Sequence, residues 1–320
     1  MVFKLKGNDV IKEQDIEVTE SLIGIYGYNN SGKTTILKEL DKVIDEENIK
    51  CIVNDGEYIR SLFIPTNRVI VRQAHTSSTQ IKDIEEFLAY KKDSYNEFDL
   101  HLRLIRENLL RNNAVRQVVK NAIIYMFGED YEFDFDRRQS DGVENIINIY
   151  CSIIWLFTWD KDIEDIKYDK LRQLLCDTSA VVMIDEIEAF LHVYVQSRML
   201  QKFKEDFSKC SFVFTTHSPL LLSRYYNIRK FQLDNGILNE INADLYYKDL
   251  DNIYEVYFNV EEFPKEAGEI INRLGDYICG EEYNRDVIVK DLKILNEQYA
   301  NVKAKYPGLV AKAEVKLGAE

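Results

Sequence analysis

The sequence of 320 residues predicts an α/β fold with a largely parallel central sheet, and three observations support this. Residues 21–26 (SLIGIY) form a short apolar run that leads into a glycine-containing loop and then a helical pattern. Two other apolar runs, 180–184 (AVVMI) and 211–216 (SFVFTT), have the β-branched character of buried parallel strands. Helical patterns separate these runs along the chain, which favours parallel strands in one sheet.

The first half of the chain contributes further elements. Residues 2–6 alternate apolar and basic side chains, and we expect 16–19 to pair with them as a hairpin. Residues 51–53 (CIV) and 61–65 (SLFIP) are predicted strands. From 79 to 127, apolar residues recur at helical spacing in two stripes: Leu102, Ile105, Leu109 and Leu110, then Val115, Val118, Val119 and Ala122.

The second half begins with 129–136, an acidic and aromatic connector that could also form an edge strand. A long helix is predicted over 142–158, and a hairpin over 231–238 around the Asn-Gly turn at 235–236. From residue 249 onward the pattern is helical, with two apolar stripes: Ile270, Ile271 and Leu274, then Val289, Leu292 and Leu295.

These elements predict three parts. Residues 1–75 and 136–245 would form the α/β domain, 76–135 an inserted helical lobe, and 246–320 a C-terminal helical tail. The length is sufficient for one large domain or two smaller ones.

Charge and composition restrict the function. The net charge of −14 and the pI of about 4.9 argue against a broad electrostatic surface for nucleic acid. The N-terminus enters strand-like sequence directly, without a signal-peptide pattern, and no apolar run is long enough to span a bilayer. We therefore expect a cytoplasmic protein without a membrane partner. Its five dispersed cysteines are expected to be free thiols: Cys51, Cys151, Cys176, Cys210 and Cys279.

Residues 27–34 read GYNNSGKT and fit the phosphate-loop pattern G-x-x-x-x-G-K-[ST] at every fixed position. Glycines let such a loop curl so that its N–H groups and the following helix N-terminus face phosphate oxygens. Lys33 is expected to reach the β- and γ-phosphates of ATP, and the Thr34 hydroxyl to ligate Mg²⁺. The alternative is a strand–helix turn with a chance Lys-Thr. The predicted ATP ligands are Asn29, Asn30, Ser31, Gly32, Lys33, Thr34 and Thr35.

Two further segments place polar residues after buried strands. Asp185 and Glu186 end the run VVMIDE, which puts them at the carboxyl edge of the sheet. We expect Asp185 to hold Mg²⁺ and Glu186 to orient or deprotonate the attacking water. His217, in TTHSP, can form a hydrogen bond with the γ-phosphate. The alternatives are solvated acids that end a strand and a local histidine cap.

Residues 138–145 (RQSDGVEN), called here the signature segment, directly precede the long helix. Ser140 could be a simple helix N-cap. The functional interpretation is that Ser140, the Gly142 N–H and the helix dipole present an anion site to the ATP of a second copy. This interpretation predicts a homodimer or higher oligomer held together by ATP.

In order, GYNNSGKT, QSDGVEN, VVMIDE, EAFLH and TTHSP resemble the ABC-type ATPase fold of the P-loop NTPases. More narrowly, residues 1–235 are similar to the bacterial branch that contains the overcoming-lysogenization-defect proteins and related phage-defence ATPases. The resemblance implies phosphate and Mg²⁺ binding by Lys33 and Thr34, and a signature contact from Ser140 and Gly142. It further implies a magnesium-side acid in Asp185, a catalytic base in Glu186 and a switch histidine in His217.

Three positions depart from the usual ABC pattern. Gln139 stands where Leu is usual in the signature. His192 replaces the aspartate of transporter ATPases, as it often does in the narrower branch. No lid glutamine is evident; the segment 64–68 (IPTNR) or Gln73 stands nearest to that role.

The tail from residue 251 resembles that of ATPases that act with a separate HNH nuclease, as in Septu-type defence. After His217 the sequence contains neither the acidic cluster of a Toprim nuclease nor an HNH-like histidine pair. Any nuclease is therefore expected to be a separate effector. Direct nucleic-acid binding stays open but is not indicated, since acids intersperse the basic residues of the lobe: Arg103, Arg106, Arg111, Arg116 and Lys120.

The sequence thus predicts a slow, regulatory ATPase that dimerises around ATP and controls an effector in anti-phage defence. Three alternatives remain at this point. They are a DNA-binding repair or chromosome-organising ATPase, a transporter ATPase, and a scaffold that binds ATP with negligible hydrolysis.

Overall fold

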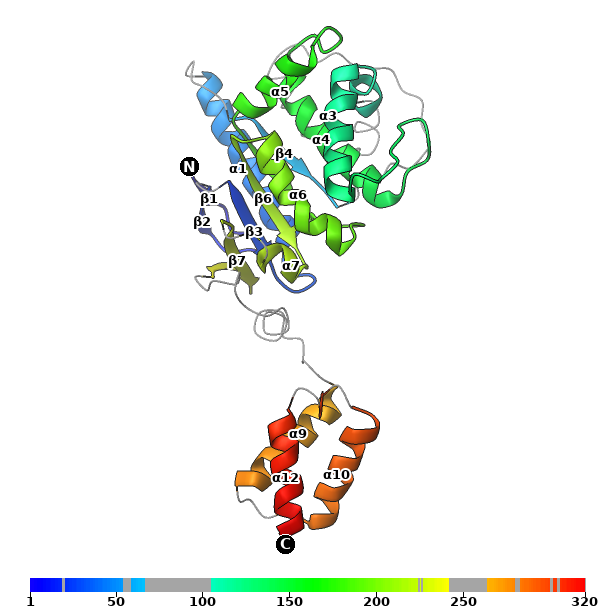
Figure 1. The fold of residues 1–320 in the computed structure, drawn as a ribbon. Helices are drawn as coiled ribbons and strands as arrows, with labels where there is room; N and C mark the ends of the chain where they lie inside the picture. The colour runs from blue at the N-terminus through cyan, green and yellow to red at the C-terminus, as the bar shows by residue number, and fades with distance from the viewer. Residues whose placement is uncertain are drawn as a thin grey trace. The chain divides into compact units, whose positions relative to one another are not determined.

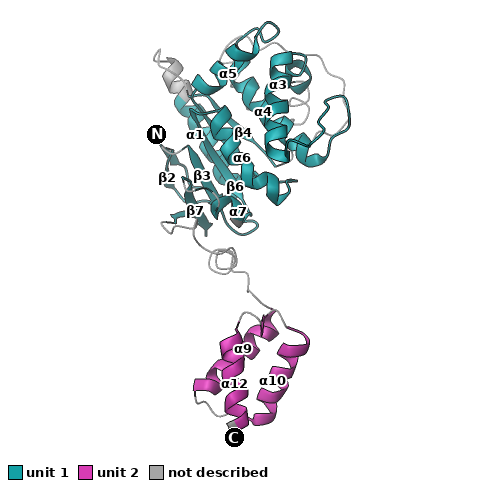
Figure 2. Cartoon of the chain, in the orientation of Figure 1, with its two compact units in different colours: residues 1–248 teal, residues 249–320 magenta. Residues whose placement is uncertain are grey.

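The computed structural model describes most of the chain as two compact units, Met1–Lys248 and Asp249–Glu320 (Figure 2). The described residues are 1–18, 21–53, 59–66, 105–223, 225, 227–241, 264–279, 283–299, 302–303 and 306–319. Much of the predicted lobe, 76–104, lies outside them, and its separation from the α/β domain stays a prediction.

The first unit is built on a six-stranded sheet in the order β4–β5–β6–β3–β7–β8. The β4–β5, β5–β6, β6–β3 and β3–β7 pairs are parallel, and β8 turns back antiparallel to β7. This confirms the α/β fold with a largely parallel sheet. The strands are β3 Leu22–Tyr26, β4 Ser61–Ile64, β5 Ala180–Ile184, β6 Cys210–Thr216, β7 Arg229–Asp234 and β8 Ile237–Glu240.

Alternate residues of each strand contribute to separate cores on the two faces of the sheet. On β5, Val182 and Ile184 belong to one core, and Val181 and Met183 to the other. Because both faces are covered, β5 can be apolar throughout. The first face is covered by α3 Asn113–Phe127, α4 Asp141–Thr158, α5 Tyr168–Asp177 and α6 Val193–Asp206, and the second by α1 Lys33–Val53 with the hairpin of β1 Val2–Leu5 and β2 Gln14–Glu17 (Figure 1).

One strand prediction is wrong, and one connector does not form the edge strand that was considered for it. Helix α1 continues to Val53, so residues 51–53 are helical; the preceding Glu-rich stretch consists of good helix formers and does not end the helix. The connector 129–136 contains turns and irregular backbone instead of an edge strand. There the Asp134 carboxylate accepts the Asp136 N–H at 3.0 Å, a local bond that competes with strand pairing.

The predicted Asn235–Gly236 hairpin is confirmed. Asn235 has φ 49° and Gly236 has φ 77°, the left-handed conformation that a tight two-residue turn requires at both positions. The Gly236 carbonyl also accepts the Lys12 N–H at 2.9 Å, so this turn anchors the loop between β1 and β2.

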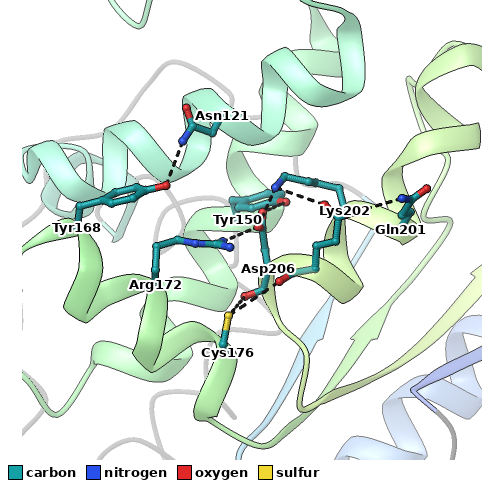
Figure 3. A network of polar contacts seen from close by, with 9 residues as sticks. Asn121, Tyr150, Tyr168, Arg172, Cys176, Gln201, Lys202 and Asp206 are labelled. Carbon is teal, nitrogen blue, oxygen red and sulfur yellow. Dashed lines mark hydrogen bonds and ion pairs between the residues drawn. The ribbon is translucent and has the colours of Figure 1, made fainter.

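One buried charge joins three helices on the first face of the sheet, as Figure 3 shows. The Asp206 carboxylate of α6 accepts hydrogen bonds from Tyr150 of α4 at 2.8 Å and Arg172 of α5 at 2.5 Å. Lys202 adds a third at 2.9 Å. Burial, together with the neighbouring Asp206 carboxylate, raises the pKa of Tyr150 well above its ordinary value of 10.0. A buried charge is tolerated only with such partners, so the network fixes α4, α5 and α6 to one another.

The second unit contains α9 Lys265–Cys279, α10 Arg285–Glu297 and α12 Pro307–Ala319, which share one apolar core. The Arg273 guanidinium pairs with the buried Asp291 carboxylate at 2.8 and 2.9 Å. Ile288 occupies the core position that was predicted for Val289, which is 51% exposed. Both residues lie at helical spacing from Leu292, so the spacing alone did not separate them. None of the described helices is both long and apolar enough to cross a bilayer.

Candidate nucleotide site

The phosphate loop lies between the end of β3 and the start of α1, and two of its glycines cannot be replaced without a clash. A Cβ at Gly27 would lie 2.7 Å from Ser31 Oγ and 2.8 Å from the Leu233 carbonyl oxygen. Gly32 has φ 98°, and its Cβ would lie 2.7 Å from Val10 Cγ1. The pattern glycines therefore serve both the curl of the loop and its close packing.

Two groups in this loop fit a polyphosphate. The Lys33 ammonium donates hydrogen bonds of 2.9 Å to the Gly27 and Tyr28 carbonyls. Burial lowers the pKa of Lys33, and the carboxylates of the neighbouring acidic residues oppose that shift. The Ser31 hydroxyl is buried and has no hydrogen-bond partner among the described residues. A cation and an unpaired donor within the curl match the chemistry of a bound phosphate.

The Asp185 carboxylate accepts hydrogen bonds from three hydroxyl groups at the carboxyl edge of the sheet. Thr34 donates to Oδ2 at 2.7 Å and Thr66 to the same oxygen at 2.9 Å. Thr215 donates to Oδ1 at 2.6 Å. The structure thus brings together the predicted pair of Thr34 and Asp185. The sequence analysis missed Thr66 and Thr215, although a hydroxyl residue at or just after the end of an apolar strand was an available signal.

A magnesium ion fits this pair through a threonine hydroxyl and a carboxylate. The described residues include no group of three or more His, Cys, Asp or Glu that could hold a metal by themselves. Magnesium bound to nucleotides commonly takes one or two protein ligands and completes its shell with phosphates and water. Thr34 and Asp185 are suited to that arrangement.

Glu186 and His217 lie next to each other at the same edge. Glu186 has φ 43°, unusual for a residue with a side chain, and its N–H donates to Thr215 Oγ1 at 2.7 Å. The Glu186 carboxylate is 42% exposed, and its Oε1 lies 4.0 Å from His217 Nε2. The structure therefore brings the predicted base and the predicted switch histidine together, with both side chains accessible to a water molecule or phosphate.

The start of α4 contacts the segment Glu186–Leu191, called here the acidic turn. A Cβ at Gly142 would lie 2.7 Å from the Phe190 carbonyl oxygen. Asn145 donates a hydrogen bond to the Ala189 carbonyl at 2.6 Å. Ser140 occupies the N-cap position but is exposed, and its side chain forms no capping hydrogen bond. No hydrogen bond among the described residues joins Ser140 or Gly142 to the phosphate loop.

The remaining predicted residues take various places. Asn29 and Asn30 are exposed in the loop, Asn30 with φ 63°, and Thr35 is half-buried in α1. His192 caps α6, with Nδ1 accepting the Tyr194 N–H at 3.3 Å. Of the candidate lid residues, Asn67, Arg68 and Gln73 lie outside the described residues.

Comparisons with known proteins give three kinds of match. The family described as "AAA domain, putative AbiEii toxin, Type IV TA system" matches residues 171–223. The Septu protein PtuA of Bacillus mycoides (strain KBAB4) is 28% identical over 212 residues, covering 57% of this chain and 29% of that protein. A probable ATPase of retron Ec83 from Escherichia coli is 23% identical over 176 residues, covering 48% of this chain and 32% of that protein. The matches thus span about 30% of the length of these relatives.

Two solved structures are also similar to this chain. One is a dimeric bacterial ABC transporter cassette, 12% identical with a TM-score of 0.39, covering 76% of this chain and 97% of that one. Another is a bacterial Atm1-family ABC exporter with ATP bound, which is 13% identical with a TM-score of 0.44. The match covers 81% of this chain and 40% of that one. The sequence matches, with their ATPase family and ATPase relative, agree with the resemblance that the five motifs indicate.

Proposed function

We propose that this chain binds ATP with Mg²⁺ at the phosphate loop, hydrolyses it slowly, and dimerises around it. In this proposal the dimer regulates a separate effector, a nuclease, in anti-phage defence. The observation that carries the proposal is the 2.7 Å bond between Thr34 and Asp185, with Glu186 and His217 beside it. In this proposal a magnesium-ligand pair adjoins an acid–imidazole pair at one edge of the sheet, an arrangement suited to phosphoryl transfer to water.

The proposed roles follow from the chemistry of each side chain. Lys33 and the loop N–H groups bind the phosphates, and Thr34 and Asp185 hold the metal. Bound magnesium would neutralise charge on the terminal phosphates. Glu186 takes a proton from the attacking water, and His217 orients the γ-phosphate by a hydrogen bond. These residues would act mainly by positioning the reacting groups and by stabilising charge on the phosphates, which are the main contributions of a protein to phosphoryl transfer.

Exposed groups near the signature segment support the dimer. The Ser140 hydroxyl is free of any capping bond and faces solvent. Phe190 is 56% exposed and has φ 64°, an uncommon conformation for an aromatic residue. Val193 and Tyr194 are also more than half exposed, at 57% and 51%. A second copy that covers this apolar surface would explain why it stays exposed in one chain.

The effector and the biological setting rest on the relatives. One is named as a Septu protein and the other as a retron ATPase, and both are longer than the matched region. The partner nuclease is proposed for this chain on that basis.

The dimer is tested with Glu186→Gln, which keeps the side-chain shape while removing the proposed base. Light scattering after size exclusion should give twice the monomer mass for this variant when ATP and Mg²⁺ are present. Without ATP, it should give the monomer mass. Lys33→Ala should stay monomeric, and phosphate release should be lost in both variants. If Glu186→Gln remains monomeric at every ATP concentration, the proposed ATP-held dimer is wrong. The proposed hydrolysis is then tested separately, by phosphate release from the wild-type chain.

A further inference from the structure

Glu188 is the acid of the acidic turn that has no part in the proposed reaction. Its Oε1 accepts the His217 main-chain N–H at 2.5 Å. Its Oε2 is buried and has no hydrogen-bond partner among the described residues. Burial raises the pKa of Glu188, and interactions with the His217 N–H, the Glu188 N–H and the Thr216 side chain oppose that shift. The Glu188 charge also acts on Lys33, so this side chain lies within electrostatic reach of the phosphate loop.

The acidic turn is bonded directly to the end of β6. The Glu186 N–H donates to Thr215 Oγ1 at 2.7 Å, and the Ile187 N–H to the Thr215 carbonyl at 3.1 Å. The turn closes on itself through the Leu191 N–H, which donates to the Glu188 carbonyl at 2.9 Å. The residues that carry Glu186 and those that carry His217 therefore form one bonded unit.

Hydrogen bonds hold the His217 main-chain N–H and the side chain of the next residue, Ser218. Glu188 accepts the His217 N–H, and the Ser218 Oγ donates a hydrogen bond to Gln196 Oε1 at 2.7 Å. Gln196 in turn donates from Nε2 to the Leu191 carbonyl at 2.8 Å. The His217 side chain remains 36% exposed, with Nε2 4.0 Å from Glu186 Oε1. The backbone is thus fixed while the imidazole stays available.

We propose that Glu188 is a positioning residue, which sets the His217 imidazole opposite Glu186 by holding the His217 N–H. This inference rests on the proposed function of the site. Without the carboxylate, the His217 N–H loses its acceptor and the strand end can shift away from the acidic turn. If the carboxylate only stabilised the fold, its removal would lower turnover equally in the presence and in the absence of the His217 side chain.

The test is a double-mutant cycle on ATP turnover with Glu188→Ala, His217→Ala and both together. Glu188→Ala should lower kcat about tenfold with KM changed less than about twofold, as expected for a lost charged hydrogen bond that acts on the reaction. In the His217→Ala background the same change should lower kcat less than about twofold, because the effect passes through His217. Glu188→Gln keeps an oxygen acceptor and should stay within about threefold of wild type. Glu205→Ala, a carboxylate removed from the surface of α6, is the control.

Hydrogen exchange of the His217 amide in the nucleotide-free chain gives a readout independent of turnover. Glu188→Ala should speed this exchange, whereas Glu188→Gln and Glu205→Ala should not. Unchanged exchange in Glu188→Ala overturns the inference, as does an equal loss of kcat with and without His217. The inference is also wrong if Glu188→Gln binds ATP but abolishes turnover, because Glu188 then acts on the water itself. If the wild-type chain turns over ATP no faster than Lys33→Ala, the proposed function is refuted. The exchange of the His217 amide then still tests whether Glu188 holds the His217 N–H.

Discussion

The Asn145 side-chain amide donates a hydrogen bond of 2.6 Å to the Ala189 carbonyl, between the first turns of α4 and the acidic turn. Asn145 is fully buried, and Gly142, one turn before it, packs against the adjoining Phe190 carbonyl. The segment proposed to meet the ATP of a second copy is thereby bonded to the segment that carries Glu186. A shift of one must move the other.

Asn145→Ala should lower the free energy of unfolding by about 1 to 3 kcal/mol, because the half-buried Ala189 carbonyl loses the hydrogen bond from the buried Asn145 side chain. Urea unfolding monitored by tryptophan fluorescence measures this loss. Asn121→Ala is the matched control, since Asn121 donates to the Tyr168 hydroxyl at 3.1 Å on the exposed surface. Its cost should stay below about 0.5 kcal/mol. Equal losses in the two variants would show that the Ala189 bond has no special weight.

Gly142→Ala should destabilise the first unit by about 1 to 3 kcal/mol, because the added Cβ would lie 2.7 Å from the Phe190 backbone oxygen. Thermal unfolding measures the change. In α9, nothing lies within 4 Å of a Cβ built at Gly275. There the same substitution should stabilise the second unit by about 0.5 to 1 kcal/mol through helix propensity. A gain in stability at Gly142 would contradict the close approach.

Thr215→Val removes a hydroxyl that donates to Asp185 at 2.6 Å and accepts the Glu186 N–H at 2.7 Å. Since Val has nearly the same shape, the loss comes from unpaired polar groups and should reach about 2 kcal/mol in urea unfolding. We also expect slower phosphate release, because the Glu186 backbone loses its anchor. Thr178→Val, which loses only a bond to the Leu174 carbonyl at 2.7 Å, is the control. Wild-type turnover in Thr215→Val would argue against this anchoring.

Tyr150→Phe should cost about 1.5 to 3 kcal/mol, because buried Asp206 loses one of its donors. The pKa of Tyr150 is raised above 10.0 in the folded chain, so the unfolded chain releases this proton first as pH rises. The stability that this proton contributes is fully present below the pKa of tyrosine in the unfolded chain, and it declines as the pH rises above that pKa. Between about pH 9 and about pH 11, stability should therefore fall less steeply in Tyr150→Phe than in wild type. Tyr194→Phe, at the surface of α6, is the matched control for the loss of a tyrosine hydroxyl.

The strands, the phosphate loop and the long helix could be predicted because their signals are local. Residues 180–184 are apolar without interruption, and the spacing of Gly27, Gly32 and Lys33 is contained in eight residues. The failures have physical reasons as well. Residues 51–53 carry strand-like side chains but follow a helix that nothing ends, and Ile288 and Val289 both fit one helical stripe.

The contacts around the site could not be predicted in the same way. Thr66 and Thr215 reach Asp185 because β4 and β6 pair with β5 in one particular register, and that register is a property of the sheet. The bond from His217 to Glu188 likewise depends on how two strand ends meet. The motifs in the sequence identified the candidate site residues. The hydroxyl and backbone groups that bond to those residues became evident only from the fold. The catalytic roles assigned to those residues stay predictions.

Asp185 is bonded to residues 151, 119 and 30 positions away along the chain. Its hydroxyl partners come from α1, from the end of β4 and from β6, so the set exists only after three neighbouring strands have assembled. A chain with one strand detached would keep every motif in its sequence and still lack the three hydroxyl partners of Asp185. In the proposed function, ATP with magnesium should therefore bind the assembled sheet and not the unfolded chain, and should raise the unfolding temperature with the logarithm of the ligand excess. Nucleotide affinity would then report how completely β4, β5 and β6 have assembled.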